Sequence, residues 1–187
     1  MALKCAPILL TERLRLRPHT LADFEAVAAM WADERVVRYI SGTPSTREQS
    51  WSRLVRYVGH WALLGFGYWV VEDRDGVYLG EVGFADYQRG ITPPLDAPEI
   101  GWVLASHAHG SGYATEAGQR IPSWADENLG AVETVCIFDP AHQASIHVAG
   151  KCGYSDPVNV DYAGADTLLM RRARQPVTHQ DAGKPAG

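Results

Sequence analysis

A short apolar strand that runs directly into a glycine-rich turn is the feature that most constrains this chain. Residues 99–119 read EIGWVLASHAHGSGYATEAGQ, in which 100–104 is apolar, 107–112 is a turn, and helical composition begins at Tyr113. A glycine turn that opens a helix leaves backbone N–H groups without internal partners beside the positive end of the helix dipole. The stretch therefore predicts an anion site, which in proteins usually takes a phosphate.

The composition is ordinary for a globular protein with a sizeable core. The chain has 187 residues, of which 46% are hydrophobic and 21% are charged, and its formal net charge is −5. Because Lys and Arg are not in excess, we expect no nucleic-acid partner. No stretch approaches the length of a membrane span, so we expect no membrane association. The negative charge favours a basic or amine substrate.

The cysteines indicate a compartment and argue against a metal centre. Cys5, Cys136 and Cys152 are odd in number and show no CxxC spacing. This usage is typical of a reducing compartment and predicts no structural zinc. Residues 1–10 contain an apolar run that is too short for a signal peptide. We expect a cytoplasmic protein, monomeric or homodimeric, without a bound metal.

Hydrophobic periodicity and turn signals predict a chain of mixed strands and helices. In the first strand, Leu14 and Leu16 are expected to face the core, and Arg13, Arg15 and Arg17 to face solvent. The expected strands are 11–18, 66–72, 77–87, 100–104, 132–138 and, as the second strand of a last hairpin, 167–171.

The helices are expected where capping residues precede amphipathic runs. Thr20 is a plausible N-cap for the first of them. The expected helices are 21–32, from 45 or 46 to about 61, from 113 to the glycine at 130, and 139–152. Residues 36–44 and 90–98 are expected to be loops. We expect one domain over residues 1–173 and a flexible C-terminal tail over 174–187.

Two nucleotide-binding motifs match the glycine turn in part, but each lacks a required residue. After Gly110 and Gly112, the dinucleotide fingerprint would need a third glycine where Thr115 stands. The Walker A loop would need a lysine before Ser or Thr, and this turn contains no lysine. The turn by itself therefore leaves the identity of its ligand open.

Three further segments accompany the turn GSGYATEA at 110–117. Residues 139–145 read DPAHQAS, 150–154 read GKCGY, and 10–18 read LTERLRLRP. Together they resemble the GNAT superfamily of acyl-CoA N-acyltransferases over about residues 8–172. The most similar branch is the Rim-type acetyltransferases, which modify N-terminal amines of ribosomal proteins.

The resemblance implies a fold and a place for acyl-CoA. The fold would be α+β (mixed α/β), with a mostly antiparallel twisted sheet of about six to seven strands, splayed at the central strand, and about four flanking helices. The pyrophosphate would lie on the backbone of the glycine turn, and the pantetheine arm would bond to the central strand like an added strand. His142 would contact the pantetheine arm and Ser145 would lie near the sulfur. The implied cofactor-binding residues are Trp102, Val103, Leu104, His109, Gly110, Ser111, Gly112, Tyr113, Ala114, His142 and Ser145.

Two residues are candidates for catalysis. Glu99 would accept the proton of the amine, directly or through water; the alternative is a solvated strand-end glutamate or an ion-pair partner. Ser145 would hydrogen-bond the departing thiolate; the alternative is a helical serine bonded to the carbonyl of Ala141. Many members of the family use a tyrosine acid at the position of Ala149, so that acid is excluded here. The oxyanion is expected to rest on a backbone N–H near Val103.

Three residues depart from the family pattern. His107 stands where Gln or Arg is common, and His142 stands where Asn is common. Pro122 lies inside the helix after the turn, and its ring predicts a kink or early break near 118–122. His107 and His109 form an H-x-H pair without nearby carboxylate or thiol ligands, so the spacing is weak evidence for a metal.

Four aromatic residues have two interpretations. They either line a pocket for the acceptor amine or pack in the core, and the core is the better prediction for each; they are Tyr39, Trp61, Phe84 and Tyr87. Cys136 lies in an apolar strand and is expected to be buried.

We therefore expect an acetyl-CoA-dependent N-acetyltransferase that moves an acetyl group to a primary amine by direct attack in a ternary complex. Acetyl-CoA would be the co-substrate. The acceptor is left open between a protein or peptide N-terminus, a free amino acid, a polyamine and an antibiotic amine. The alternative is a non-catalytic sensor that binds CoA or acyl-CoA.

Overall fold

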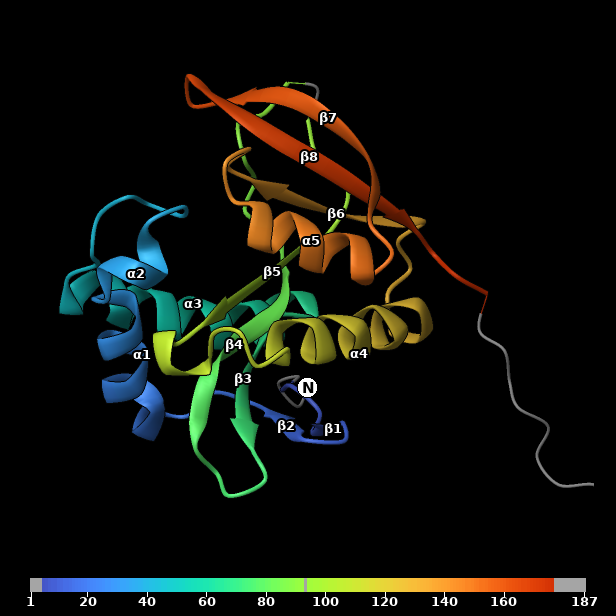
Figure 1. Ribbon diagram of the computed structural model, residues 1–187. Helices are drawn as coiled ribbons and strands as arrows, with labels where there is room; N and C mark the ends of the chain where they lie inside the picture. The colour runs from blue at the N-terminus through green and yellow to red at the C-terminus, as the bar shows by residue number, and fades with distance from the viewer. Residues whose placement is uncertain (1–4, 93, 177–187) are drawn as a thin grey trace, which may run out of the picture.

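The computed structural model describes residues 5–92 and 94–176. Within these residues, eight strands form one sheet in the order β1-β2-β3-β4-β5-β6-β8-β7 (Figure 1). The strands are β1 (Leu9–Leu10), β2 (Leu14–Arg17), β3 (Tyr68–Asp73), β4 (Tyr78–Ala85), β5 (Glu99–Leu104), β6 (Glu133–Phe138), β7 (Ser155–Tyr162) and β8 (Ala165–Ala173). Neighbouring strands are antiparallel except β5 and β6, which are parallel. The expected mixed α+β fold with a mostly antiparallel sheet is confirmed.

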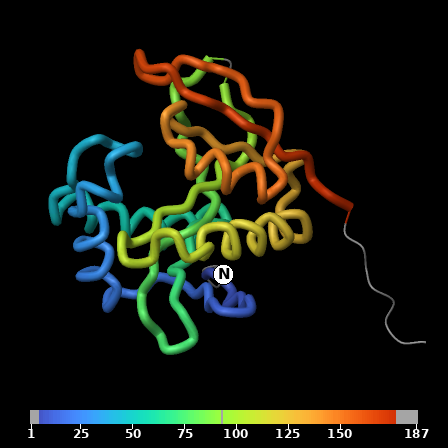
Figure 2. Tube along the Cα trace, in the orientation of Figure 1, coloured from blue at the N-terminus to red at the C-terminus, as the bar shows by residue number. Residues whose placement is uncertain are grey.

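Five α-helices and two 3₁₀ turns lie in the described part of the chain. They are η1 (Leu21–Asp23), α1 (Phe24–Trp31), α2 (Glu34–Val37), α3 (Arg47–Leu64), η2 (Ser106–Ala108), α4 (Tyr113–Asn128) and α5 (Gln143–Lys151). Helices α4 and α5 lie against one face of the sheet, and α3 lies behind it (Figure 1). Strand β5 links the N-terminal part of the sheet to the part formed by β6, β8 and β7 (Figure 2). None of the described helices is long and apolar enough to cross a membrane.

The amphipathic pattern placed the core correctly at the start of the chain. Leu14 and Leu16 on β2 are fully buried. Thr20 forms a capping box with Asp23, which satisfies two backbone N–H groups at the start of η1. Leu21, the first residue of the helix expected over 21–32, is 72% exposed, and the first turn is 3₁₀ and not α-helical.

Two helix boundaries differ from the expectation. Part of the stretch expected to be a loop forms α2, whose N-cap Asp33 accepts a hydrogen bond from the backbone N–H of Arg35. Helix α5 begins at Gln143 and not at Asp139. Asp139 instead accepts a hydrogen bond from Ala141 N at 2.8 Å, and this local turn competes with the first helical turn.

The proline in α4 does not end the helix. The element runs from Tyr113 to Asn128 with Pro122 inside it, so the expected early break is wrong. Apolar residues on both sides of the proline are buried, among them Ile121 and Trp124. Their burial, at up to about 3 kcal/mol for each large side chain, outweighs the cost of roughly 3 kcal/mol for a proline in a helix. A bend of the helix axis near 118–122 stays a prediction.

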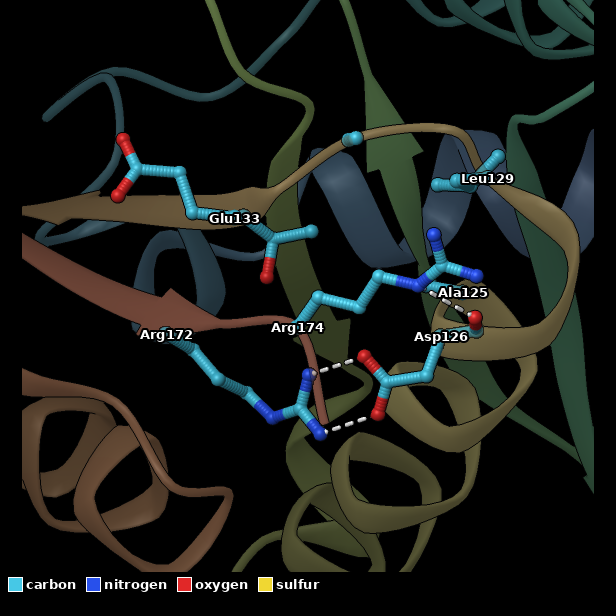
Figure 3. A pocket seen from close by; sticks show the side chains of 8 residues that line it. Ala125, Asp126, Leu129, Glu133, Arg172 and Arg174 are labelled. Carbon is cyan, nitrogen blue, oxygen red and sulfur yellow. Dashed lines mark hydrogen bonds and ion pairs between the residues drawn. The ribbon is translucent and has the colours of Figure 1, made fainter. Parts of the chain in front are cut away.

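A buried ion pair joins the last strand to α4 beside a small pocket (Figure 3). Arg172 of β8 donates to both carboxylate oxygens of Asp126, at 2.9 and 2.6 Å, and both side chains are about nine-tenths buried. Arg174, in the region expected to be a flexible tail, donates through Nε to the backbone oxygen of Asp126 at 2.9 Å. The domain boundary at 173 stays a prediction, and most of the expected tail, 177–187, lies outside the described residues.

Replacing Asp126 with alanine is expected to lower the free energy of unfolding by about 3 kcal/mol, because Arg172 keeps its desolvation cost without its partner. Urea denaturation measures the change. The matched control is Glu25→Ala, which breaks the exposed pair of Arg47 and Glu25 and is expected to leave the midpoint almost unchanged. Equal shifts for the two variants would contradict the prediction.

Candidate functional site

The central strand β5 leaves its parallel neighbour after a single paired position. Glu99 pairs with Val135, and Val135 N donates to Pro98 O at 3.0 Å. Toward Leu104 the structure records no further pairing between β5 and β6. Backbone N–H and C=O groups on that edge of β5 are therefore without strand partners, and such groups require another partner when they are buried.

A cleft of about 580 Å³ opens at this divergence. One wall is formed by β5 together with the end of β6 and the start of α5. The opposite side is formed by α3 and by the segment 38–42 that follows α2, and residues 165–167 of β8 close one end. The cleft therefore gathers residues from both halves of the sheet.

The glycine turn after β5 has the backbone geometry of an anion site. Gly110 and Gly112 have φ angles of +75° and +80°, in the left-handed region that favours glycine. Gly112 is the N-cap of α4 and has no side chain that accepts from the first N–H groups of the helix. These N–H groups are available to an anion, as the sequence predicts. The side chain of His109 holds the turn, because its Nε2 donates to Leu104 O at 2.9 Å.

Arg13, which directly precedes β2 and was expected to face solvent, holds the same turn from outside. Arg13 Nη1 donates to Ser111 O at 2.9 Å, and Arg13 Nε donates to Glu116 Oε2 at 2.7 Å. The guanidinium also lies 4.6 Å from the centre of the Tyr113 ring. We call this set the Arg13–Glu116 clamp. Sequence reasoning missed it because the partners lie about a hundred residues apart.

The clamp changes the titration of its carboxylate. Burial raises the pKa of Glu116, but hydrogen bonds from Thr11 and Arg13 outweigh it and hold the pKa below the ordinary value of 4.5. Glu116 is thus ionised at neutral pH and completes the clamp as an anion.

Side chains of β5 alternate between the two faces of the sheet. Trp102 points to the α5 face, where its Nε1 donates to Ser145 Oγ at 3.2 Å. Gly101 points to the opposite face, where a Cβ would lie 2.1 Å from the hydroxyl oxygen of Tyr68. Any larger residue at this position would therefore force the Tyr68 side chain to shift, and Glu99 and Val103 lie on the same face as Gly101.

Glu99 is an ion-pair partner, as one of its two interpretations proposed. Arg89 donates to both of its oxygens, at 2.5 and 2.8 Å, and the carboxylate is only 8% exposed. Arg89 also donates to the hydroxyl of Tyr162 at 3.0 Å. The pair lies in the wall of the cleft, where an ionised Glu99 is stabilised by the guanidinium.

Ser145 is buried and lies in the wall of the cleft. Its Oγ accepts from Trp102 and lies 3.3 Å from His142 Nε2, both in the same wall. These contacts take the place of the bond to the carbonyl of Ala141 that was the alternative interpretation of Ser145. The ring of His142 stacks on Tyr39 with 4.8 Å between the ring centres. Burial lowers the pKa of His142, so its ring is uncharged at neutral pH. The ring is then able to accept a hydrogen bond from the Ser145 hydroxyl.

The aromatic candidates divide between cleft and core. Tyr39 lines the cleft, contrary to the expectation of core packing. Tyr87 lines the cleft and also packs against the core cluster of Tyr57, Tyr68 and Ala85. Trp61 and Phe84 are buried in the main core, as expected. Cys136 is also buried, and burial raises the pKa of its thiol.

The family model for the acetyltransferase (GNAT) domain matches residues 13–155. The chain belongs to the GNAT acetyltransferase family. It is 32% identical to a putative GNAT-family acetyltransferase from Bordetella pertussis, whose structure matches with a TM-score of 0.78 over 90% of this chain and 100% of that one. It is 27% identical to the N-acetyltransferase p20 of Bacillus licheniformis, over 78% of this chain and 81% of that protein.

A more distant GNAT structure has the same fold. The spermidine N-acetyltransferase from Vibrio cholerae, solved with CoA and spermine, is 16% identical and matches with a TM-score of 0.69 over 88% of this chain and 97% of that one. At this identity the likeness shows the fold alone. As a GNAT protein, the chain is an acyltransferase.

Replacing Glu116 with glutamine is expected to reduce stability most near neutral pH. Because the folded pKa lies below 4.5, the ionised carboxylate stabilises the fold above that pH, and this stabilisation is lost as the pH falls through the folded value. The difference in free energy of unfolding between the wild type and Glu116→Gln should therefore shrink in acid. Urea denaturation over a pH series measures it, with Glu127→Gln, an exposed carboxylate on the same helix, as control. The same pH profile for both variants would contradict the prediction.

Proposed function

We propose that this enzyme transfers the acetyl group of acetyl-CoA to a primary amine by direct attack in a ternary complex. The observation that carries the proposal is the divergence of β5 and β6. It opens a cleft that has the anion site of the glycine turn toward one end and the buried hydroxyl of Ser145 in its wall. The N-terminus of α4 and the turn before it offer backbone N–H groups to a pyrophosphate. The edge of β5 at residues 102–104 offers main-chain groups to the pantetheine arm.

The proposed roles at the acyl end follow from the alternation of β5. His142 and Ser145 lie on the α5 side of the cleft, where the thioester sulfur would be. A backbone N–H near Val103 would stabilise the developing oxyanion. Ser145 would donate its proton in a hydrogen bond to the departing thiolate. A thiolate with a pKa near 8.5 leaves with little assistance, so the contribution of Ser145 would be modest.

The amine must lose a proton before or during its attack. At pH 7 this costs about 1.4 kcal/mol for an α-amine with a pKa near 8, and about 4.6 kcal/mol for a lysine amine with a pKa near 10.4. An α-amine therefore needs only a weak base. In our proposal Glu99, paired with Arg89, receives the proton through water, because the guanidinium occupies both of its oxygens.

The Rim-type relationship also belongs to the proposal. It rests on the opening LTERLRLRP at 10–18, which in the fold supplies Arg13 to the clamp on the glycine turn. An acceptor with a protein or peptide N-terminal amine is consistent with the low cost of deprotonating an α-amine. A helix broken at Pro122 would have favoured the sensor alternative, but α4 is continuous through Pro122.

The direct test follows acetyl-CoA consumption with a panel of amines and peptide N-termini. Turnover is expected with at least one amine, and acetyl-CoA is expected to raise the melting temperature because it binds the native state. Stabilisation by acetyl-CoA without transfer to any amine would favour the sensor. Absence of any stabilisation by CoA would contradict both functions.

Replacing Ser145 with alanine is expected to lower kcat about tenfold and to leave KM for acetyl-CoA nearly unchanged, because the hydroxyl assists only the departing thiolate. Steady-state kinetics with the best amine measures the change. Ser123→Ala, at an exposed position of α4, is the matched control. An unchanged kcat in Ser145→Ala would remove Ser145 from the mechanism.

A further inference from the structure

Three arginines line the cleft on the side opposite α5. Arg38 is the C-cap residue of α2, and Arg53 and Arg56 belong to α3. All three are among the residues that form the cleft. We call them the arginine wall. None of them is part of the binding site that the glycine turn and β5 offer to acetyl-CoA.

Each arginine of the wall stacks on an aromatic ring. The guanidinium carbon Cζ of Arg53 lies 3.5 Å from the centre of a Trp31 ring, and that of Arg56 lies 5.3 Å from the centre of the Tyr87 ring. Arg38 lies 5.1 Å from the centre of the Tyr39 ring. Stacking covers the flat face of a guanidinium and leaves the N–H groups at its edge available, which is the geometry that binds carboxylate and phosphate.

The wall has no counter-ion among the residues that the structure describes. Arg53 makes only a long hydrogen bond to Ser45 Oγ, at 3.4 Å, and no carboxylate lies within ion-pair distance of any member. By contrast, Arg47 on the same helix pairs with Glu25, and Arg35 beside α2 pairs with Asp33. The stacked guanidiniums are therefore positioned but not neutralised.

The acidic residues of the cleft do not cancel this charge. Glu99 is bound by Arg89, and the other two acidic residues of the lining, Asp139 and Asp166, form no ion pair with the wall. Outside the Arg89–Glu99 pair, the lining contains three arginines and two aspartates, a formal net charge of +1. The cleft is thus slightly positive, in a chain whose formal net charge is −5. A cleft with one dominant sign of charge attracts a ligand of the opposite sign.

The phosphates of CoA are not the partners of the wall. The turn residues 109–114, all of them described, do not line the cleft. They follow the far end of β5, and at about 3.3 Å per residue this strand separates them from Glu99 by roughly 17 Å. The arginine wall is therefore available to bind the other substrate, the acceptor amine.

We propose that the acceptor amine carries an anionic group, a carboxylate or a phosphate, and that the arginine wall binds it. This inference rests on the proposed function, since it names the class of amine that the same cleft accepts. Polycationic amines are poor acceptors, because they meet uncompensated guanidiniums. The overall negative charge of the chain by itself favoured a basic substrate. The positive charge of the arginine wall favours an acidic one instead.

The test compares amines that differ only in charge. Alanyl tripeptides amidated at the C-terminus present the same α-amine, with the second and third residues both glutamate, both glutamine or both lysine. Wild-type kcat/KM is expected to be about tenfold or more higher for the glutamate than for the lysine peptide, a difference of ~1.4 kcal/mol. Comparing kcat/KM for phosphoethanolamine and ethanolamine shows whether the wall prefers a phosphate on the acceptor, as the peptides show for a carboxylate. Spermidine is expected to be the poorest acceptor.

The variant Arg53→Gln/Arg56→Gln is expected to remove most of this preference by raising KM for the acidic acceptor. The matched control Arg47→Gln, on the same helix and outside the cleft, should keep the wild-type preference. Stabilisation by acetyl-CoA should be the same in all three proteins, which verifies that the variants are folded.

Three results overturn the inference. The lysine peptide or spermidine could be the preferred acceptor, or the double variant could keep the same selectivity as Arg47→Gln. In both cases transfer itself is observed, so the proposed function stands and only the anionic acceptor fails. Absence of transfer to any amine in the set and the wider panel, despite binding of acetyl-CoA, would overturn the proposed function as well.

Discussion

The divergence of β5 from β6 is the constraint on which the rest of the site depends. A parallel pair that continued beyond Glu99 and Val135 would satisfy the edge of β5 and close the cleft. Divergence leaves main-chain groups of β5 unpaired on that edge, and the cleft opens between β5 and the end of β6. The same strand delivers the glycine turn at its end, so one element positions both the anion site and the cleft wall.

Charge is distributed around this cleft in two ways. Where a charged group has a structural task, it is paired: Arg13 with Glu116 at the turn, and Arg89 with Glu99 in the wall. The arginine wall stands apart, because its guanidiniums are ordered by aromatic stacking and have no carboxylate partner among the described residues. Stacking allows an arginine to be rigid and still available to an anion, which an ion pair does not.

Local patterns were sufficient for much of the fold. Period-two alternation placed Leu14 and Leu16 in the core, and the capping box at Thr20 marked the first helical turn. Gly110 and Gly112 take the left-handed conformations that their turn requires, and Ser145 lies in the wall of the cleft. Each of these features depends on residues close together in sequence, or on a motif in which the spacing itself carries the geometry.

What the sequence by itself determined is therefore the succession of strand, glycine turn and helix, together with the family that this succession marks. Only the tertiary structure decided that α4 continues through Pro122, that Arg13 holds the turn, and that Arg53 and Arg56 line the cleft without a counter-ion among the residues described. The physical reason is the same in each case. Burial of Ile121 and Trp124, and contacts between residues many positions apart, supply free energies that no local propensity contains.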